Sequence, residues 1–363
     1  MSELMKVGIT HGDYNGIGYE VSLRALADET ITELFTPVFY GIPELVEKAA
    51  ADFVLTLPPV RVIKRSEEAE DGYLNVVDLG IRPELEPGKV SHKAGEAAVM
   101  ALERAVSDVL AGKIDSIVTA PISKEAVQSD RFKFTGHTEF LADRSHAQAQ
   151  MILYSDQLRV ALLSTHLAVS DIPASVSREA VSDAVRRFDA ALRQDFNIER
   201  PCIAVMSLNP HCGDGGLLGT EEIREITPAI NELSEKLLVF GPYAADGFFA
   251  SGAWKKFDGV LAMYHDQGLA PFKALAGSEG VNFSAGLPFV RTSPDHGTGY
   301  DIAWKGEADC TSMRQAIYSA IDLTRNRRRN IEAAANPLPA IPERPDRGER
   351  TNKEPKNHKP SVQ

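Results

Sequence analysis

Short strand-like runs of apolar and β-branched residues alternate with amphipathic helical runs along most of this chain. This alternation is typical of α/β folds, in which a helix follows each strand and packs back onto a face of the sheet. The strand-like runs are 6–10, 36–41, 115–121, 151–155, 158–165, 202–208 and 259–264. The helical runs are 19–28, 43–50, 91–110, 181–195, 221–238 and 313–328. We therefore expect a mixed α/β fold with helices on both sheet faces.

Two local signals refine this prediction. The runs 151–155 and 158–165 flank the turn at Ser155-Asp156, which favours an antiparallel pair of strands. Ser91 precedes the longest helical run and is expected to be its N-cap.

Length and charge limit the classes of function. A chain of 363 residues, 43% hydrophobic, has room for one large or two moderate domains. Its formal net charge of -12 argues against a general nucleic-acid binder. No apolar run reaches the length of a membrane span, and the N-terminus lacks an apolar signal core. Three cysteines without a CxxC pair fit a reducing compartment, so we expect a cytoplasmic protein without a membrane partner.

Three histidines lie where strand-like runs end. They are His166 in LLSTHLA, His211 in SLNPHCGDGG and His265 in LAMYHDQG, and turn-forming residues are expected to follow each. The carboxyl ends of parallel strands meet at one sheet edge, where ligands bind. Three imidazoles at that edge would hold a divalent metal with one coordination position open, as in catalytic zinc sites. The alternative for each histidine is an ordinary surface or hydrogen-bonding role.

Neighbours of these histidines bear on the same site. Asp266 follows His265 and is placed either to orient an imidazole or to act as a base. Cys212, beside His211, is either a fourth ligand or simply a small residue in a tight loop.

Lys273, Asn282 and Arg291 form a second candidate cluster downstream of His265. Asn282 lies in a strand-like run, and Arg291 is expected where a strand ends. One lysine, one amide and one arginine would hold a carboxylate or phosphate, the arginine through two parallel hydrogen bonds. The alternative is that the three are unrelated surface groups.

The segment 135–139, TGHTE, is a third candidate. Thr138 is expected to cap a helix that begins at Glu139. A helix N-terminus with a hydroxyl and the imidazole of His137 beside it suits a phosphate, although it is equally read as a capped helix alone.

The loop 11–18, HGDYNGIG, follows the first strand, where a dinucleotide fingerprint would stand. GxGxxG would need glycine at Val21, and no GxxxxGK[ST] occurs. A standard Rossmann site is therefore not expected.

Seven long strings occur in an order that identifies a family. They are VTAPISKEA, FTGHTEFLA, LLSTHLAVSDIP, LNPHCGDGGLLGTEE, GPYAADGFF, MYHDQGLAPFK and GLPFVRTSPDHGTGYDIA. Together they strongly resemble the 4-hydroxythreonine-4-phosphate dehydrogenase family of pyridoxal phosphate biosynthesis, over about residues 6–325.

The resemblance implies a two-subdomain α/β/α fold similar to isocitrate and isopropylmalate dehydrogenases, with the active-site cleft between the subdomains. Residues 1–130 and 290–334 would form the first subdomain, and residues 131–289 the second, which carries the dimer interface. Such a fold binds its nicotinamide cofactor, NAD or NADP, without GxGxxG. A homodimer with a shared active site is also implied. The proline-rich tail, 335–363, is expected to be disordered.

Site residues follow from the resemblance position by position. The metal ligands match His166, His211 and His265, with Zn²⁺ as the first expectation and Mg²⁺, Co²⁺ or Mn²⁺ as alternatives. The substrate-binding residues match His137, Thr138, Lys273, Asn282 and Arg291. The catalytic candidates are Asp246, Asp266 and Lys273.

The implied reaction is the NAD(P)-dependent oxidation of 4-phosphohydroxy-L-threonine to 2-amino-3-oxo-4-phosphobutanoate. That β-keto acid then loses carbon dioxide to give 3-amino-2-oxopropyl phosphate. The alternative within the family is a dehydrogenase of 4-phosphothreonate or 4-phosphoerythronate. A metal-dependent hydrolase and a non-catalytic metal-binding protein are alternatives from other classes.

One motif departs from the family pattern. The first loop usually contains GDPAGIGPE, whereas this chain has GDYNGIGYE. Because both prolines are replaced, the sequence alone does not predict how rigid this loop is.

Overall fold

A single twisted sheet forms the centre of the molecule in this computed structural model, which describes residues 4–129 and 131–335. Its strand order is β3-β4-β2-β1-β5-β12-β11-β6-β7-β10-β8-β9. The strands are β1 (Lys6–Thr10), β2 (Thr36–Gly41), β3 (Val60–Ile63), β4 (Leu74–Asp78), β5 (Ser116–Thr119), β6 (Gln150–Tyr154), β7 (Arg159–Leu162), β8 (Cys202–Met206), β9 (Leu238–Tyr243), β10 (Gly259–Ala262), β11 (Val281–Ala285) and β12 (Val290–Pro294).

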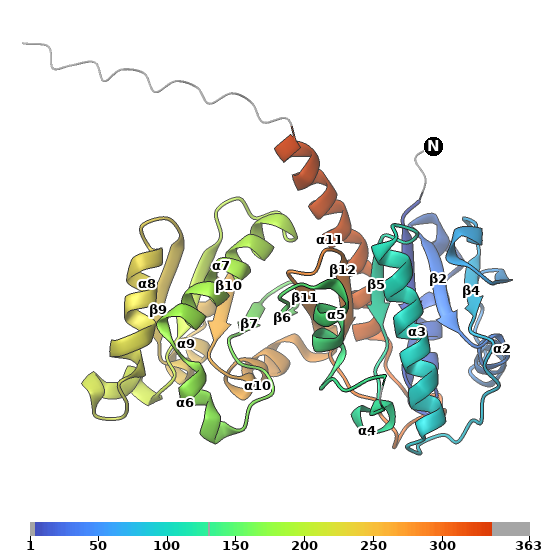
Figure 1. The fold of residues 1–363 in the computed structure, drawn as a ribbon, viewed down its shortest axis with the longest axis horizontal. Coiled ribbons are helices and arrows are strands. Elements are labelled where there is room, and N and C mark those ends of the chain that lie inside the picture. The colour runs from blue at the N-terminus through green and yellow to red at the C-terminus, as the bar shows by residue number, and fades with distance from the viewer. Residues whose placement is uncertain (1–3, 130, 336–363) are drawn as a thin grey trace, which may run out of the picture.

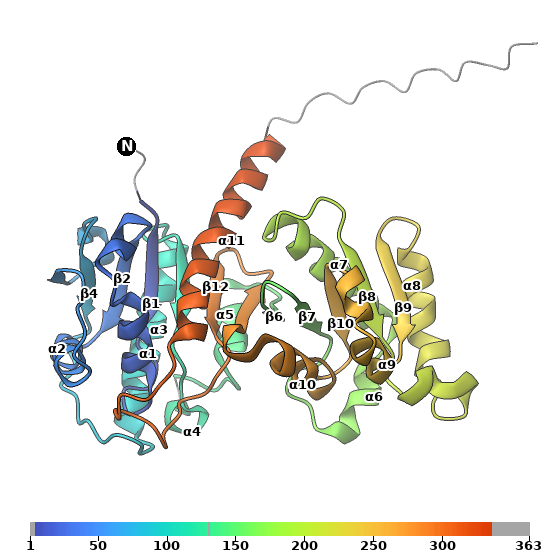
Figure 2. The ribbon, with the colours of Figure 1, turned by 180° about the vertical axis from the view of Figure 1, so that it is seen from behind.

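Helices cover both faces of this sheet (Figures 1 and 2). They are α1 (Gly18–Leu26), α2 (Pro43–Asp52), α3 (His92–Leu110), α4 (Lys124–Val127), α5 (His137–Ser145), α6 (Ile172–Ser175), α7 (Arg178–Gln194), α8 (Thr227–Leu233), α9 (Ala245–Ala250), α10 (His265–Ala276) and α11 (Thr311–Ala335). In the half that contains β1, α3 packs on one face and α1, α2 and α11 pack on the other. In the half that contains β10, α7 and α8 lie opposite α9 and α10. The α/β class is thus confirmed.

The two halves of the sheet meet at an antiparallel pair. β12 runs parallel to β5 and antiparallel to β11, and β11 is in turn antiparallel to β6. The two residue ranges expected for the subdomains, 1–130 with 290–334 and 131–289, contribute strands to different halves. Their behaviour as two subdomains stays a prediction.

Helix α11 packs across this meeting point. Its residues from Met313 to Ile321 belong to the core beside β1, whereas Leu323 belongs to the core beside β10. Further along, the Arg327 guanidinium donates to Asp195 Oδ1 at 2.8 Å and to the carbonyl of Leu287 at 2.9 Å, both in the other half. The helix therefore ties the halves together by apolar packing and by a buried ion pair.

Most of the predicted elements are present, and three predictions need correction. The strands 151–155 and 158–165 form the expected antiparallel pair, β6 and β7. The predicted helix 221–238 is wrong at its end, because α8 stops at Leu233 and β9 begins at Leu238. Ser91 occupies the cap position of α3, but its side chain makes no capping bond. His265 leads into a helix, α10, where turn-forming residues were expected.

Two further predictions concern the proline-rich tail and membrane-spanning helices. The tail 335–363 lies outside the described residues, apart from Ala335, which ends α11. Across residues 4–129 and 131–335, no helix is both long and apolar enough to cross a bilayer.

The altered first loop is held by hydrogen bonds in place of its missing prolines. The Asn15 side chain accepts from the backbone N–H of Glu86 at 2.8 Å and donates to the carbonyl of Lys89 at 3.1 Å. The hydroxyl of Tyr19 accepts from the N–H of Ile42 at 2.8 Å. Because three separate segments meet through these bonds, GDYNGIGYE is fixed in place without proline.

His11 begins this loop and is fully buried against the ring of Tyr19, at a centroid distance of 5.3 Å. Burial lowers the pKa of His11 to about 4. As the pH falls below about 6.5, the unfolded chain therefore takes up the proton first and the folded state loses stability. Between pH 7.5 and pH 5, this residue should remove about 2 kcal/mol of unfolding free energy.

The measurement is urea unfolding at several pH values for the wild type and for His11→Gln, which cannot titrate in this range. We expect the loss between pH 7.5 and 5 to be smaller in the variant, while exposed His92→Gln keeps the wild-type slope. Equal slopes in all three proteins would contradict the effect of burial on His11.

Candidate functional site

Three neighbouring parallel strands carry the candidate metal ligands. β10 lies between β7 and β8 and is parallel to both, so their carboxyl ends lie at one edge. His166 follows β7, His265 follows β10 and His211 follows β8. We call the three loops with these residues the histidine edge. The sheet topology thus brings the imidazoles to one edge, as predicted from their positions after strands.

The imidazoles are near one another but are not assembled around a single point. The ring centroids of His166 and His265 are 6.4 Å apart. Within the described ranges, no three His, Cys, Asp or Glu side chains are close enough to hold one metal ion. The side chains of His166 and His265 are open to solvent, with exposed fractions of 37% and 42%. The described residues of one subunit therefore do not form a complete metal site in this arrangement.

Two of these histidines have a carboxylate on the same ring nitrogen. Glu139 Oε1 is 3.3 Å from His166 Nδ1, and Asp266 Oδ1 is 2.7 Å from His265 Nδ1. A carboxylate at Nδ1 favours the tautomer that leaves Nε2 free as a ligand, which is the usual arrangement behind metal-bound histidines. The donor set at the histidine edge therefore suits a divalent cation in its chemistry. Asp266 has the contact that its orienting role requires.

His211 lies in a loop with an unusual backbone. Five successive residues, from His211 to Gly215, have positive φ values between 45° and 76°. This region disfavours residues with a side chain, and such conformations often persist at functional sites. Cys212 Sγ lies 3.5 Å from the carbonyl oxygen of Pro242, which agrees with a small residue in a tight loop.

A cavity of about 530 Å³ adjoins His211. Asp246, from the first turn of α9, and Asp266, from the first turn of α10, both line it. The two acidic candidates and one predicted ligand thus share a cavity, and the contact of Asp266 with His265 connects it to the rest of the histidine edge.

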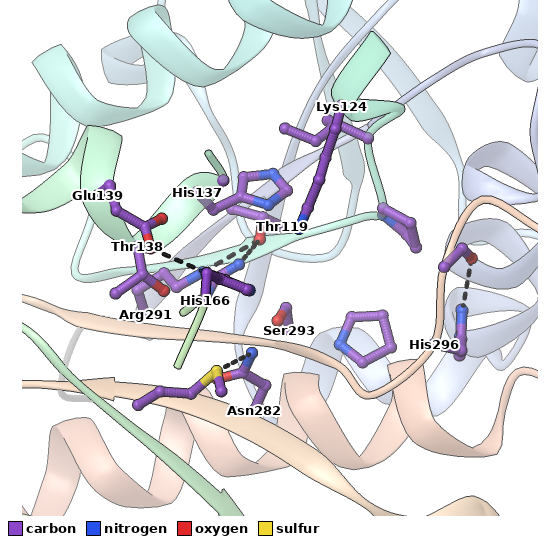
Figure 3. A pocket seen from close by; sticks show the side chains of 16 residues that line it. Thr119, Lys124, His137, Thr138, Glu139, His166, Asn282, Arg291, Ser293 and His296 are labelled. Carbon is purple, nitrogen blue, oxygen red and sulfur yellow. Dashed lines mark hydrogen bonds and ion pairs between the residues drawn. The ribbon is translucent and has the colours of Figure 1, made fainter. Parts of the chain in front are cut away.

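A second cavity, of about 220 Å³, contains most of the predicted substrate residues. His137 and Thr138 enter it from α5, Asn282 from β11 and Arg291 from β12, as Figure 3 shows. His166 also lines it, so the cavity borders the histidine edge. We call it the anion pocket. Its lining comes from both predicted subdomain ranges.

Arg291 gives the anion pocket its charge. The residue was expected where a strand ends, but it lies inside β12, between β5 and β11, and is only 2% exposed. Its guanidinium donates to Thr119 Oγ1 at 2.6 and 3.1 Å and to Ser284 Oγ at 3.0 Å. Among the described residues, no carboxylate forms an ion pair with it. A buried cation held only by hydroxyls is poised to receive an anionic ligand.

Three other described residues of the anion pocket have polar atoms that lack a hydrogen-bond partner. Within the described chain, His137 Nε2, Asn282 Oδ1 and His296 Nε2 are buried without a hydrogen-bond partner. Burial, reinforced by the charge of Arg291, holds the pKa of His137 well below its usual value, so this imidazole is neutral near pH 7. These atoms point to a polar ligand that would satisfy them.

One prediction for this region is wrong. Thr138 does not cap α5, since the helix begins at His137 with Gly136 at the cap position. The Thr138 hydroxyl instead lies 3.2 Å from the Ser284 hydroxyl, which accepts a hydrogen bond from Arg291. Lys273 lines neither cavity, and its role in substrate binding stays a prediction. Its ammonium is 3.2 Å from Asp295 Oδ1, and its side chain is 51% exposed.

Sequence reasoning did not single out several residues of the pocket. They are Thr119, Lys124, Glu139, Ser293 and His296, together with Ser284, which lies behind the lining and contacts Arg291. Some stand in motifs that were already quoted, for example Lys124 in VTAPISKEA and His296 in RTSPDHGT. A strand-end threonine such as Thr119 carries no signal of its own, because only the fold places it beside Arg291.

Comparison with known proteins now places the chain. Residues 33–320 match the family described as "Pyridoxal phosphate biosynthetic protein PdxA". The chain belongs to the PdxA family. A relative from Bacteroides thetaiotaomicron, named 4-hydroxythreonine-4-phosphate dehydrogenase, is 49% identical over 339 residues, which cover 92% of this chain and 93% of the relative.

Two further proteins similar to this PdxA family member are also named as dehydrogenases. A D-threonate 4-phosphate dehydrogenase from Salmonella typhimurium is 39% identical, over 88% of this chain and 99% of the relative. The crystal structure of a 4-hydroxythreonine-4-phosphate dehydrogenase from Klebsiella pneumoniae is 34% identical with a TM-score of 0.76, over 89% of this chain and all of that one. This PdxA family member is therefore an oxidoreductase of the dehydrogenase class.

Proposed function

We propose that this PdxA family member oxidises 4-phosphohydroxy-L-threonine to 2-amino-3-oxo-4-phosphobutanoate with NAD or NADP, and that the product loses carbon dioxide to give 3-amino-2-oxopropyl phosphate. The observation that carries the proposal is that His166 belongs to the histidine edge and also lines the anion pocket of Arg291. One small molecule can therefore place its phosphate at Arg291 and its hydroxyl at the histidines.

The roles in binding follow from charge. Arg291, His137, Thr138 and Asn282 would hold the phosphate, the arginine through two parallel hydrogen bonds. His166, His211 and His265 would hold a divalent cation, which as a Lewis acid lowers the pKa of an alcohol near it. Zn²⁺ suits three neutral imidazoles best, and Co²⁺, Mn²⁺ or Mg²⁺ are alternatives.

The chemistry needs a proton acceptor and a hydride acceptor. Asp246 and Asp266 share the cavity beside His211, so either can take the hydroxyl proton directly or through a water. The carbon–hydrogen bond at the same carbon then breaks, and its electron pair passes to the oxidised nicotinamide. Lys273 is held by Asp295 at the side of the site, from which it would offset the substrate carboxylate.

A third cavity offers a place for the nicotinamide cofactor. It measures about 320 Å³ and shares His296 and Gly297 with the anion pocket. Gly277, Gly280 and Gly299 also line it, so backbone groups are accessible to a ligand there. Because His296 and Gly297 line both cavities, a cofactor in one would lie close to a substrate in the other.

A homodimer is the proposed assembly. Four exposed apolar side chains flank the histidine edge: Leu167 (47%) and Val169 (82%) follow His166, and Leu217 (80%) and Leu218 (46%) follow His211. Apolar side chains gathered beside polar functional groups are typical of a contact surface. A second copy seated there would shield the open histidines from water.

Charged residues in this surface should separate the subunits. We expect the double variant Val169→Asp, Leu217→Asp to elute as a monomer in light-scattering chromatography and to lose activity at least about 100-fold, since buried charges without partners oppose association. Its unfolding temperature should stay close to that of the isolated wild-type subunit. The control, Ile331→Asp, changes another exposed apolar residue, on α11, and it should remain a dimer.

The reaction itself is tested by following absorbance of the reduced nicotinamide. The assay compares 4-phosphohydroxy-L-threonine with the 4-phosphates of D-threonate and D-erythronate, each with NAD and with NADP, before and after chelation. Preference for the threonine phosphate, lost on chelation and restored by Zn²⁺, would support the proposal. A preference for D-threonate 4-phosphate would favour the activity named for the Salmonella relative, and product without reduced nicotinamide would indicate a hydrolase.

A further inference from the structure

Glu139 is an anomaly in the anion pocket. Of the described residues that line this cavity, it is the single carboxylate, and its side chain is 36% exposed. A negative charge close to Arg291 repels the phosphate that the pocket would bind. A role other than substrate binding is therefore needed to explain an acid at this position.

The position of Glu139 indicates a role in orienting His166. It lies in the first turn of α5, directly after Thr138, and its Oε1 is 3.3 Å from Nδ1 of His166. Figure 3 shows this contact between α5 and the segment with His166. Because the carboxylate contacts Nδ1, it can hold that nitrogen in its protonated form and leave Nε2 as the ligand atom.

The same arrangement recurs at a second histidine. Asp266 contacts Nδ1 of His265 at 2.7 Å. The two carboxylates come from different helices, α5 and α10, yet they occupy equivalent positions on the two rings that lie 6.4 Å apart. Matching carboxylates on neighbouring imidazoles are expected if both rings act as ligands of one cation.

We propose that Glu139 is a positioning residue for the cation site: it fixes the tautomer and orientation of His166 and so raises the affinity of the histidine edge for a divalent cation. The inference rests on the proposed function, because it assumes that His166 is a ligand. The repulsion between Glu139 and a bound phosphate is the consequence of placing this carboxylate beside Arg291.

Two ligands distinguish this role from a structural one, because the effects on them have opposite signs. Glu139→Gln and Glu139→Ala should each weaken Zn²⁺ binding by about 10- to 100-fold. Both variants remove a negative charge from the anion pocket, so inorganic phosphate should bind about threefold more tightly or better. General damage to the site would weaken both ligands.

The experiment measures Zn²⁺ and inorganic phosphate binding by calorimetry for the full chain, without substrate or nicotinamide. Nitrogen chemical shifts of His166 report its tautomer directly. Glu232→Gln is the control, since Glu232 pairs with Arg178 and Arg186 on the surface of α8, and this variant should bind both ligands like the wild type.

Two results would overturn the inference while leaving the proposed function intact: unchanged Zn²⁺ affinity in both Glu139 variants, or a loss of Zn²⁺ and phosphate binding together. A wild-type protein that binds no divalent cation would be a different failure. It would remove the metal part of the proposed function, and the role of Glu139 with it.

Discussion

Replacement of His211 by asparagine is expected to lower turnover at least about 1,000-fold and to remove tight binding of a divalent cation. One of the three proposed imidazole ligands would be lost, and the remaining two could not hold the ion in the same geometry. Asparagine is chosen because residue 211 has a φ of 54°, a conformation that asparagine tolerates better than alanine. The measurements are steady-state kinetics and Zn²⁺ titration of the same protein preparation.

His211→Ala should have the same effect on turnover with a slightly larger effect on stability. Circular dichroism and the unfolding temperature of His211→Asn should match those of the wild type, because the side chain is exposed. If this variant kept full activity after its metal had been stripped, the histidine edge could not be a metal site.

Replacement of Arg291 by methionine is expected to separate activity from stability. We expect kcat/KM to fall about 1,000-fold, because the two proposed charge-assisted hydrogen bonds to the phosphate would be lost. The unfolding temperature should be no lower than that of the wild type. Among the described residues no carboxylate forms an ion pair with the buried guanidinium, so its removal relieves a desolvation penalty. Methionine fills a similar length of space without charge.

The matched variant for this prediction is Arg327→Met. Arg327 is also buried, but it is paired with Asp195 at 2.8 Å, so its loss leaves a buried carboxylate alone. We expect Arg327→Met to lower the unfolding temperature and to leave the KM of the folded enzyme nearly unchanged. If Arg291→Met were the less stable of the two, Arg291 would be a structural residue and not an anion-binding one.

The sequence was most informative where one residue sits in a strong local pattern. Histidines after strand-like runs led to the histidine edge, because parallel strands end together. Local patterns were less informative where the fold decides the environment. Arg291 was placed at a strand end, but its neighbours Thr119 and Ser284 come from other strands, so its burial could not be foreseen.

Proline explains two of the missed elements. β9 contains Pro242, which an edge strand tolerates because one side of its backbone needs no partner. α10 contains Pro271, and a proline in a helix interior argues against a helix. In both cases packing within the fold outweighed a local preference, as Phe272 of α10 is fully buried in the core beside β10.

The rigidity of the first loop could be judged only from its tertiary contacts. GDYNGIGYE lacks the prolines of the family pattern, and its rigidity could not be judged from composition. Asn15 and Tyr19 supply hydrogen bonds to distant segments, so the chain has replaced a conformational restriction by tertiary contacts.

The place of β12 in the sheet has a consequence for how the protein is made. β12 lies between β5 and β11, although it is the last strand to leave the ribosome. Until residue 294 has been synthesised, β5 presents an unpaired edge, and the two halves have no strand to join them. Sheet completion must therefore wait for almost the whole chain, which exposes the nascent N-terminal half to aggregation and gives chaperones a period in which to act.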